Sequence, residues 1–293
     1  MKNIYVEITN RCNLSCDFCP GHKRPLGNMS AKNFSVVAEK LNGKVENLFL
    51  HIMGEPLLHP ELEQIIEIAD RMDVKLKITT NGTLLPAALP ILLKSKRLHT
   101  VCISLHSFEG NSGGEADWQR CENYVRRCFE SAARLAESGK FAVLRLWNLD
   151  ERGDGKESGF NREVMRLAEE YFPREREEWV KNHRGERVAT HVFMEWGERF
   201  DWPEITEEVQ NVKETNEYGS DNCHALLTQV GILCDGSIVP CCLDRNGDIT
   251  FGNIFETELE KALESPRAKK MKEGMAHHRF TEKLCHTCGF KRK

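Results

Sequence analysis

Three cysteines spaced as CxxxCxxC constrain this chain more than any other feature of its sequence. Cys12, Cys16 and Cys19 follow directly on the largely apolar run 4–8. Three thiolates on one short loop are able to bind three irons of a 4Fe-4S cubane and leave the fourth iron without a protein ligand. An open coordination position suits chemistry, whereas sites for structure or electron transfer normally close all four positions. The spacing alone would also fit a structural zinc loop or a set of buried thiols.

Length and composition indicate a globular protein without a membrane anchor. The 293 residues, 40% of them hydrophobic, are sufficient for a sizeable core in one large or two modest domains. The start of the chain has no apolar signal segment, and no later run approaches the ~18 apolar residues that span a bilayer. We therefore expect a cytoplasmic protein. A net charge of -4 offers no basic excess for nucleic acid or membranes, and twelve cysteines without a secretion signal favour metal ligation over disulfides.

Strand patterns alternate with helix patterns along the first two thirds of the chain. Ser30 is expected to cap a helix over 31–41. Six such strand and helix units, joined by right-handed crossovers, predict a parallel sheet that closes into a partial, TIM-like (β/α)6 barrel. Barrel enzymes place their chemistry at the carboxyl ends of the strands. The expected strands are 4–8, 47–52, 75–80, 100–105, 141–147 and 190–194.

The aromatic residue before the third cysteine, Phe18, extends the motif to CxxxCxΦC. In this respect the sequence resembles the radical S-adenosylmethionine (SAM) enzymes. The resemblance implies that Cys12, Cys16 and Cys19 bind a 4Fe-4S cluster and that Phe18 lies beside the adenine of SAM. It also implies that the open iron takes the amino and carboxylate groups of the methionine moiety.

The resemblance continues at the ends of later strands. Gly54-Glu55-Pro56 resembles the GGEP motif, in which backbone groups receive the methionine amino group of the cofactor, with Met53 in place of the first glycine. Ser104 resembles a ribose-contacting residue, and Arg145 with Asn148 could meet the cofactor carboxylate through charge-assisted hydrogen bonds. The alternative is that the first is an ordinary turn and the others are satisfied polar residues at a barrel rim.

A second set of cysteines lies in the C-terminal quarter of the chain. Cys223 and Cys241 flank two apolar runs joined by Asp235-Gly236, a hairpin signal, and Cys285 and Cys288 form a terminal CxxC. Four thiolates of this kind would surround a second cluster or, alternatively, one zinc ion. The pattern resembles the twitch domain, a shortened SPASM domain, and implies one auxiliary 4Fe-4S cluster. We therefore expect a radical SAM core over 1–203, a linker over 204–222 and a small α+β twitch domain over 223–293.

The other cysteines are assigned with less support from spacing. Cys241 fits the family spacing better than its neighbour Cys242. Cys234, in the hairpin, is either a packing residue or a thiol aimed at the substrate. The remaining cysteines are expected to pack in the core: Cys102 in a strand, and Cys121 and Cys128 on one helical stripe.

The resemblance implies an enzyme that reductively cleaves SAM to a 5'-deoxyadenosyl radical and abstracts hydrogen from a substrate. We expect this substrate to be a ribosomal peptide or protein residue that becomes cross-linked, epimerised or oxidised, although no separate domain for a leader peptide is evident. The alternatives are a radical SAM dehydrogenase or other enzyme acting on a small molecule and, from another class, a non-catalytic iron-sulfur or zinc protein. A low-potential electron donor such as flavodoxin or ferredoxin is the implied partner.

The segment 195–203 is predicted to line the substrate cavity. It carries two tryptophans, a phenylalanine and several charges directly after the last barrel strand, an odd composition for a plain connector. The sequence does not identify the catalytic residues; the candidates are Glu195 and Arg199 of this segment together with the thiols Cys234 and Cys242. The alternative is that the rings of this segment only cover the open end of the barrel.

Overall fold

A single sheet runs through the computed structural model, which describes residues 1–111, 118–149, 159–172, 179–182, 185–207 and 223–292. The strand order is β10-β9-β1-β2-β3-β4-β5-β8-β7-β6. Its centre is a run of six parallel strands: β1 (Asn3–Val6), β2 (Asn47–Phe49), β3 (Lys75–Thr80), β4 (Leu98–Ser104), β5 (Phe141–Leu149) and β8 (Val192–Glu198). These are the six strands expected from the sequence, and they confirm the partial barrel.

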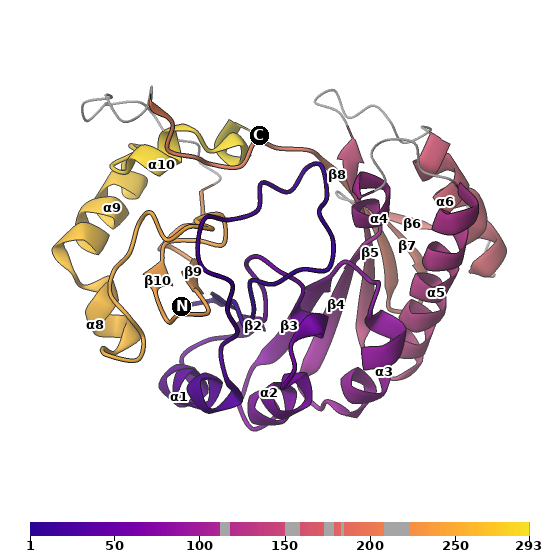
Figure 1. The fold of residues 1–293 in the computed structure, drawn as a ribbon, viewed down its shortest axis with the longest axis horizontal. Coiled ribbons are helices and arrows are strands. Elements are labelled where there is room, and N and C mark those ends of the chain that lie inside the picture. The colour runs from indigo at the N-terminus through magenta and orange to yellow at the C-terminus, as the bar shows by residue number, and fades with distance from the viewer. Residues whose placement is uncertain (112–117, 150–158, 173–178, 183–184, 208–222, 293) are drawn as a thin grey trace.

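The main helices cover the outer face of the curved sheet (Figure 1). In α1, the Ser30 hydroxyl accepts a hydrogen bond from the Asn33 amide and so caps the helix as expected. Phe34, Val37 and Leu41 on its inner stripe are fully buried. The helices are α1 (Ala31–Leu41), α2 (Leu62–Ala69), α3 (Leu85–Lys94), α5 (Trp118–Glu137) and α6 (Gly159–Tyr171), with the short α4 (His106–Gly110) and the 3-10 turn η1 (Pro56–Leu58) at strand ends.

The two faces of each barrel strand have different roles. Ile4 and Val6 of β1 are buried in the core beneath the helices, whereas Tyr5 is only partly buried and lies on the inside of the curve. The same alternation continues through β3 and β5. Because side chains alternate along a strand, one set of residues builds the core and the other lines the concave face. Cys121 and Cys128 are buried in the core, as expected for packing residues. Cys102 is buried too, but it corrects the expectation of a core residue: its neighbours Val101 and Ile103 lie in the core, whereas Cys102 lies beside Arg145 and Thr79.

An antiparallel hairpin that was not expected from the sequence precedes the last barrel strand. β6 (Val180–Asn182) pairs with β7 (Gly185–Ala189), and β7 pairs with β8. These strands are short and polar, so no apolar alternation marked them.

The C-terminal part adds a hairpin and small helices to the barrel. β9 (Gln229–Ile232) and β10 (Ile238–Val239) form the predicted hairpin around Gly236. β9 also pairs in parallel with β1, from Asn3 opposite Gln229 to Val6 opposite Ile232, so the hairpin continues the barrel sheet. The remaining elements are α8 (Leu259–Leu263), α9 (Pro266–Ala276), α10 (Lys283–His286) and η3 (Gly289–Arg292). Of the expected linker, 208–222 lies outside the described residues, and the domain boundaries stay predictions.

Candidate radical SAM and auxiliary-cluster sites

The cysteine loop, residues 10–28, leaves the carboxyl end of β1 and crosses the open middle of the barrel as the indigo strand-to-helix connection in Figure 1. Its two arms are held together by Asn10, which is 3% exposed. The Asn10 side-chain nitrogen donates to the Pro25 carbonyl at 2.9 Å, and its oxygen accepts from the Gly27 amide at 2.8 Å. One buried amide therefore closes the loop that carries the three cysteines.

The tip of the cysteine loop packs on α4. The Asp17 amide donates to the Gly110 carbonyl at 3.0 Å, and the Cys16 thiol donates to the Ser107 carbonyl at 3.3 Å. A Cβ atom added at Gly110 would lie 2.6 Å from Asp17 Oδ1 and 2.7 Å from the Phe18 ring. Such distances are too short for non-bonded atoms. Gly110 is therefore the position that lets the loop approach the helix.

The other thiols of the loop lie close enough to Cys12 and Cys16 to affect the ionisation of these two. Burial, followed by the charges of Cys19 and Cys12, raises the pKa of Cys16 to about 12. Burial also raises the pKa of Cys12, whose sulfur accepts a 3.8 Å hydrogen bond from Asn81. Without a metal the Cys12 and Cys16 thiols stay protonated, and iron binding must displace their protons. A grouping of mutually repelling thiolates is what a cluster site requires.

Phe18 lies in a pocket of ring and charge contacts. Its ring centroid is 4.9 Å from that of His106, and the Arg199 guanidinium carbon lies 5.8 Å from it. Burial lowers the pKa of His106 to about 4, so this imidazole is neutral near pH 7. Arg199 also pairs with Asp17 at 3.3 Å. The residue that follows β8 therefore reaches the aromatic residue of the cysteine motif.

Close packing leaves no room for a side chain at Gly54, which the sequence did not reveal. Its φ is +77°, and an added Cβ would lie 2.6 Å from the Thr9 carbonyl oxygen and 2.8 Å from the Arg11 carbonyl oxygen. The next amide, that of Glu55, donates to the same Arg11 carbonyl at 2.8 Å. The Gly54-Glu55-Pro56 turn is thus pressed against the start of the cysteine loop.

The Glu55 side chain is 1% exposed and is used by the protein itself. Its carboxylate accepts from Asn81 N at 2.6 Å, Thr80 Oγ1 at 2.8 Å and Leu57 N at 3.0 Å. Burial raises the pKa of Glu55 to about 7, against the effect of these hydrogen bonds. Glu55 therefore ties the end of β2 to the end of β3, and Pro56 opens the buried turn η1.

Arg145 and Asn148 point to different partners. Arg145 Nε donates to Glu195 Oε2 at 2.8 Å on the inside of the barrel. Ser104, Arg145 and Glu195 lie opposite one another on the neighbouring strands β4, β5 and β8. Asn148 exchanges hydrogen bonds with Asn161 of α6 at 2.8 and 3.0 Å and donates to Glu109 at 2.8 Å. The structure therefore brings Ser104, Arg145 and Glu195 together and leaves Asn148 outside this group.

Several residues of the concave face were not singled out from the sequence. The Tyr5 ring stacks on Phe49 at 4.4 Å and meets the edge of His51 at 5.6 Å, while the Lys77 ammonium lies 5.2 Å from the Phe49 centroid. Two nitrogens here, His51 Nδ1 and Trp147 Nε1, are buried without a hydrogen-bond partner among the described residues. Buried polar atoms normally have partners. The concave face is therefore suited to a bound polar molecule.

The segment after β8 joins the barrel to the C-terminal part. Phe200 packs against Trp202 at 5.3 Å and Phe290 at 6.0 Å. The Gly289 amide donates to the Asp201 carbonyl at 2.9 Å. Trp202 contacts a small apolar cluster with Tyr5 and Cys242. These contacts give the rings a bridging role, and they run from the concave face to the terminal CxxC.

The four predicted auxiliary cysteines gather in one place. Burial is the first cause that raises the pKa of Cys285, and the charges of Cys223 and Cys288 follow. Burial likewise raises the pKa of Cys241 well above its ordinary value, with a further contribution from Cys285. Residues more than forty positions apart in the chain are thus neighbours in the fold.

Cys241 and Cys242 face opposite ways. Cys241 packs against the main core together with Cys223 and Cys285, whereas Cys242 belongs to the small cluster with Tyr5. The Tyr5 hydroxyl donates a hydrogen bond to the Cys242 sulfur, and burial raises the pKa of Cys242 to about 11. Alternation along the chain therefore directs Cys241 to the other auxiliary cysteines and Cys242 to the inside of the barrel.

The described part of the chain shows no disulfide, no single-ion site and no helix that could span a membrane. None of the twelve cysteines forms a disulfide. Within the described ranges, no three His, Cys, Asp or Glu side chains are arranged to hold a single metal ion. No helix among these residues has the length and apolar character to cross a bilayer.

Two family models match the two parts of the chain. One, described as the radical SAM superfamily, matches residues 6–140, and the other, described as an iron-sulfur cluster-binding domain, matches residues 223–289. The chain belongs to the radical SAM superfamily. It is a radical SAM enzyme with a SPASM-type auxiliary domain, and its cofactors are SAM, a 4Fe-4S cluster in the core and an auxiliary iron-sulfur cluster. The two groups of thiols are a suitable donor set for these clusters.

Known proteins resemble the chain over nearly its whole length. The antilisterial bacteriocin subtilosin biosynthesis protein AlbA of Bacillus subtilis is 26% identical over 94% of this chain. The aligned region is 62% of AlbA, so the chain spans about three fifths of that relative. Among solved structures, BtrN in complex with AdoMet and 2-DOIA has a TM-score of 0.58 and 18% identity, with 98% of this chain and 92% of BtrN covered. Streptococcus suis SuiB bound to precursor peptide SuiA has a TM-score of 0.57 and 16% identity, with 99% and 70% covered. These structures share the fold.

Proposed function

We propose that this radical SAM enzyme modifies a residue of a ribosomal peptide or of a protein by hydrogen abstraction. The observation that carries the proposal is the similarity to AlbA, a bacteriocin biosynthesis protein, over 94% of this chain, including the auxiliary domain. The outcome would be a cross-link, an epimerised centre or an oxidised residue. When bound, SAM and the first cluster supply a 5'-deoxyadenosyl radical, and the protein's task is orientation and exclusion of water.

We assign the cofactor contacts by the positions that match the family motif. Cys12, Cys16 and Cys19 would bind the first cluster, and Phe18 would lie beside the adenine. The Gly54-Glu55-Pro56 turn would present backbone groups to the methionine amino group.

Further cofactor contacts are proposed for Ser104 and Arg145, which share one register level of the barrel. Glu195 already pairs with Arg145 and holds its guanidinium in place. The other edge of this guanidinium would therefore be oriented for hydrogen bonds to the carboxylate of SAM. Asn148, which is held by Asn161 and Glu109, would then act on the position of α6 and α4 rather than on the cofactor.

The auxiliary cluster is assigned to Cys223, Cys241, Cys285 and Cys288. We further propose that a cytoplasmic low-potential donor such as flavodoxin or ferredoxin reduces the first cluster. The auxiliary cluster would either accept an electron from the substrate or hold the substrate in place.

The substrate itself is proposed to lie against the concave face. Tyr5, His51 and Lys77 line its floor, and Trp202 with Cys242 covers the side toward the auxiliary domain. A side chain that enters there would meet rings, a cation and the two buried nitrogens that lack protein partners. The second candidate function is modification of a small molecule. BtrN, crystallised with AdoMet and 2-DOIA, shares this fold, and the match covers 92% of the BtrN chain.

The experiment is anaerobic reconstitution followed by reduction and mass spectrometry. The parent should release 5'-deoxyadenosine and methionine, and a peptide encoded beside the gene should change mass. In Arg199→Ala, cleavage of SAM should persist while the modified peptide declines by about tenfold, because Arg199 belongs to the segment proposed to line the substrate cavity and the radical would form while its target is no longer held. If SAM is cleaved but no neighbouring peptide or protein is ever modified, the small-molecule reading replaces this one.

A further inference from the structure

We propose that the buried ion pair of Glu7 and Arg24, called here the latch, is the part through which the auxiliary domain positions the cofactor-binding turn. Glu7 is then a positioning residue, since its contacts are with protein groups alone. The inference rests on the proposed function, because it takes the Gly54-Glu55-Pro56 turn as the site that receives SAM.

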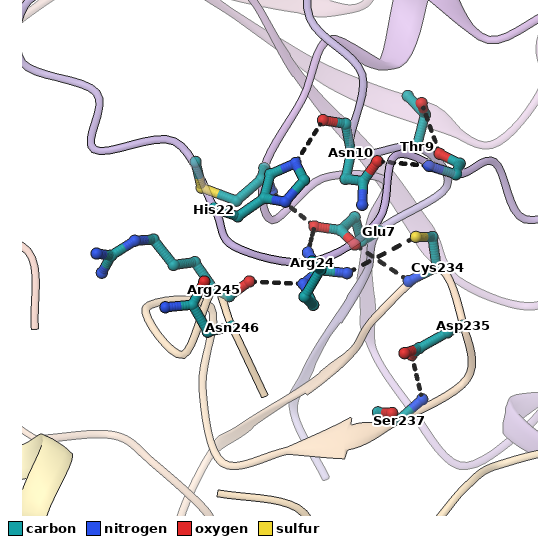
Figure 2. A network of polar contacts seen from close by, with 12 residues as sticks. Glu7, Thr9, Asn10, His22, Arg24, Cys234, Asp235, Ser237, Arg245 and Asn246 are labelled. Carbon is teal, nitrogen blue, oxygen red and sulfur yellow. Dashed lines mark hydrogen bonds and ion pairs between the residues drawn. The ribbon is translucent and has the colours of Figure 1, made fainter. Parts of the chain in front are cut away.

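Glu7 is fully buried at the carboxyl end of β1 and binds three different segments (Figure 2). Its Oε1 accepts from Arg24 Nη2 at 2.6 Å and from the Met53 amide at 3.2 Å. Its Oε2 accepts from the Cys234 amide at 3.1 Å. One carboxylate therefore joins the cysteine loop, the residue before the cofactor turn and the auxiliary hairpin.

Arg24 extends the same connection into the auxiliary domain. Its Nε donates to the Arg245 carbonyl at 2.7 Å, and Nη1 lies 3.7 Å from the Cys234 sulfur (Figure 2). Its side chain is 10% exposed. Arg245 in turn donates to the Pro203 carbonyl and pairs with Glu204 at 3.5 Å. The latch thus reaches the segment that follows β8 as well.

A charged pair is a costly way to fill such a place unless every member is satisfied. Here each carboxylate oxygen has a backbone donor in addition to the ion pair, so the three segments are fixed by directional bonds rather than by packing. Apolar side chains of similar size would hold the segments together but would not fix the position of the Met53 amide.

Through Glu7, a displacement of the auxiliary hairpin would reach the cofactor turn, because the same carboxylate binds the Cys234 and Met53 amides. Met53 N is held by Glu7, and Gly54 rests on the Thr9 carbonyl two residues farther along the same strand end. Displacing the Cys234 amide would remove one of the fixed partners of that carboxylate. We infer that SAM meets a fully ordered turn only when the auxiliary hairpin is seated.

The test uses Glu7→Gln in the reconstituted full-length enzyme, with SAM affinity and hydrogen exchange as measurements. SAM should bind about tenfold more weakly, which corresponds to ~1.4 kcal/mol. Amide exchange should accelerate by at least about tenfold both in 229–239 and in 50–57, while the iron content stays that of the parent. Neither measurement needs turnover, so a failure of the latch is distinguished from a failure of the proposed function, which parent SAM cleavage and peptide mass test.

Asp70→Asn is the matched control, because Asp70 also holds two segments through three donors, the Ser95 hydroxyl and the amides of residues 96 and 97, at the opposite end of the barrel. It should lower stability without changing SAM affinity. If Glu7→Gln does not fold, Glu7→Gln with Arg24→Gln leaves no unpaired buried charge and should show the same two effects. Unchanged SAM affinity in the folded latch variant, exchange that rises in 229–239 alone, or equal weakening by Asp70→Asn would overturn the proposal.

Discussion

The concave face contains an ionisable side chain, His51, whose pKa is shifted mainly by burial. Burial is the first cause that lowers the pKa of His51 to about 3, and the charge of Arg145 adds to it. The imidazole is therefore neutral at pH 7, with Nδ1 unpartnered among the described residues. A neutral ring among Tyr5 and Phe49 is compatible with an aromatic surface that a substrate side chain could contact.

This burial predicts acid sensitivity of the metal-free protein. Well above pH ~6.5, His51 is neutral in both the folded and the unfolded chain, so it does not contribute to the pH dependence of the free energy of unfolding. Between pH 6.5 and 3 the unfolded chain binds a proton that the folded chain does not, and the free energy of unfolding falls as pH falls. From pH 6.5 to 5 we expect a loss of about 2 kcal/mol from this residue. Denaturant unfolding should show this loss in the parent and not in His51→Phe; parallel curves for the two proteins would contradict it.

Among the elements, α4 is the one that determines how closely the cysteine loop approaches the barrel. Three of its backbone or side-chain positions contact the loop, and Gly110 has no room for a Cβ atom. The same is true of Gly54 against Thr9 and Arg11. A substitution at Gly54 would therefore disturb the cysteine loop as well as the cofactor turn, and it is a poor test of SAM contact by itself.

Gly110→Val should displace the cysteine loop and weaken the first cluster. We expect the purified, reconstituted variant to lose about half its iron, since only one of two 4Fe-4S clusters depends on this loop. Gly159→Val is the control, because a Cβ at Gly159 at the start of α6 would meet nothing within 4 Å. Equal iron in the Gly110 and Gly159 variants would show that α4 does not support the cluster.

At the scale of the whole molecule, the auxiliary domain continues the barrel sheet. β9 pairs with β1, the strand that leads into the cysteine loop, and Cys223, Cys285 and Cys288 of the C-terminal part lie close to one another. The cysteine loop thus leaves the carboxyl end of the strand that pairs with the auxiliary hairpin. This arrangement gives the auxiliary domain a direct mechanical relation to the radical core.

Metal content tests this organisation. The reconstituted parent should carry about eight irons and eight sulfides, and simultaneous change of Cys12, Cys16 and Cys19 to alanine should leave about half the iron. Cys241→Ser should also halve the iron, whereas Cys242→Ser should not, because Cys242 bonds to Tyr5 instead of facing the other auxiliary thiols. Stoichiometric zinc at the C-terminal cysteines would rule out the auxiliary cluster.

Local signals were sufficient for much of this protein. The cysteine spacing, the Ser30 cap of α1, the apolar patterns of the six barrel strands and the Asp235-Gly236 hairpin are each set by a few neighbouring residues, so the sequence alone determined them. The superfamily followed from Phe18 and the cysteines because that motif is local as well. The strand predictions missed the short, polar strands β6 and β7. The bounds of the last barrel strand were also wrong: β8 runs from Val192 to Glu198 rather than over 190–194, so the first four residues of the segment 195–203 belong to the strand.

Long-range contacts were decided by the tertiary structure. Nothing in the neighbourhood of Asn148 predicts its pairing with Asn161, and nothing near Arg145 shows that Glu195 already occupies its guanidinium. The latch of Glu7 with Arg24 joins residues that lie beside Cys234 only after β9 pairs with β1. A hydrogen bond is chosen by which groups meet once the chain has folded, and a sequence pattern reports only which groups are near along the chain. That is why cluster ligands could be proposed from the sequence, whereas the contacts of Glu7, Arg145 and Asn148 appeared only in the folded chain.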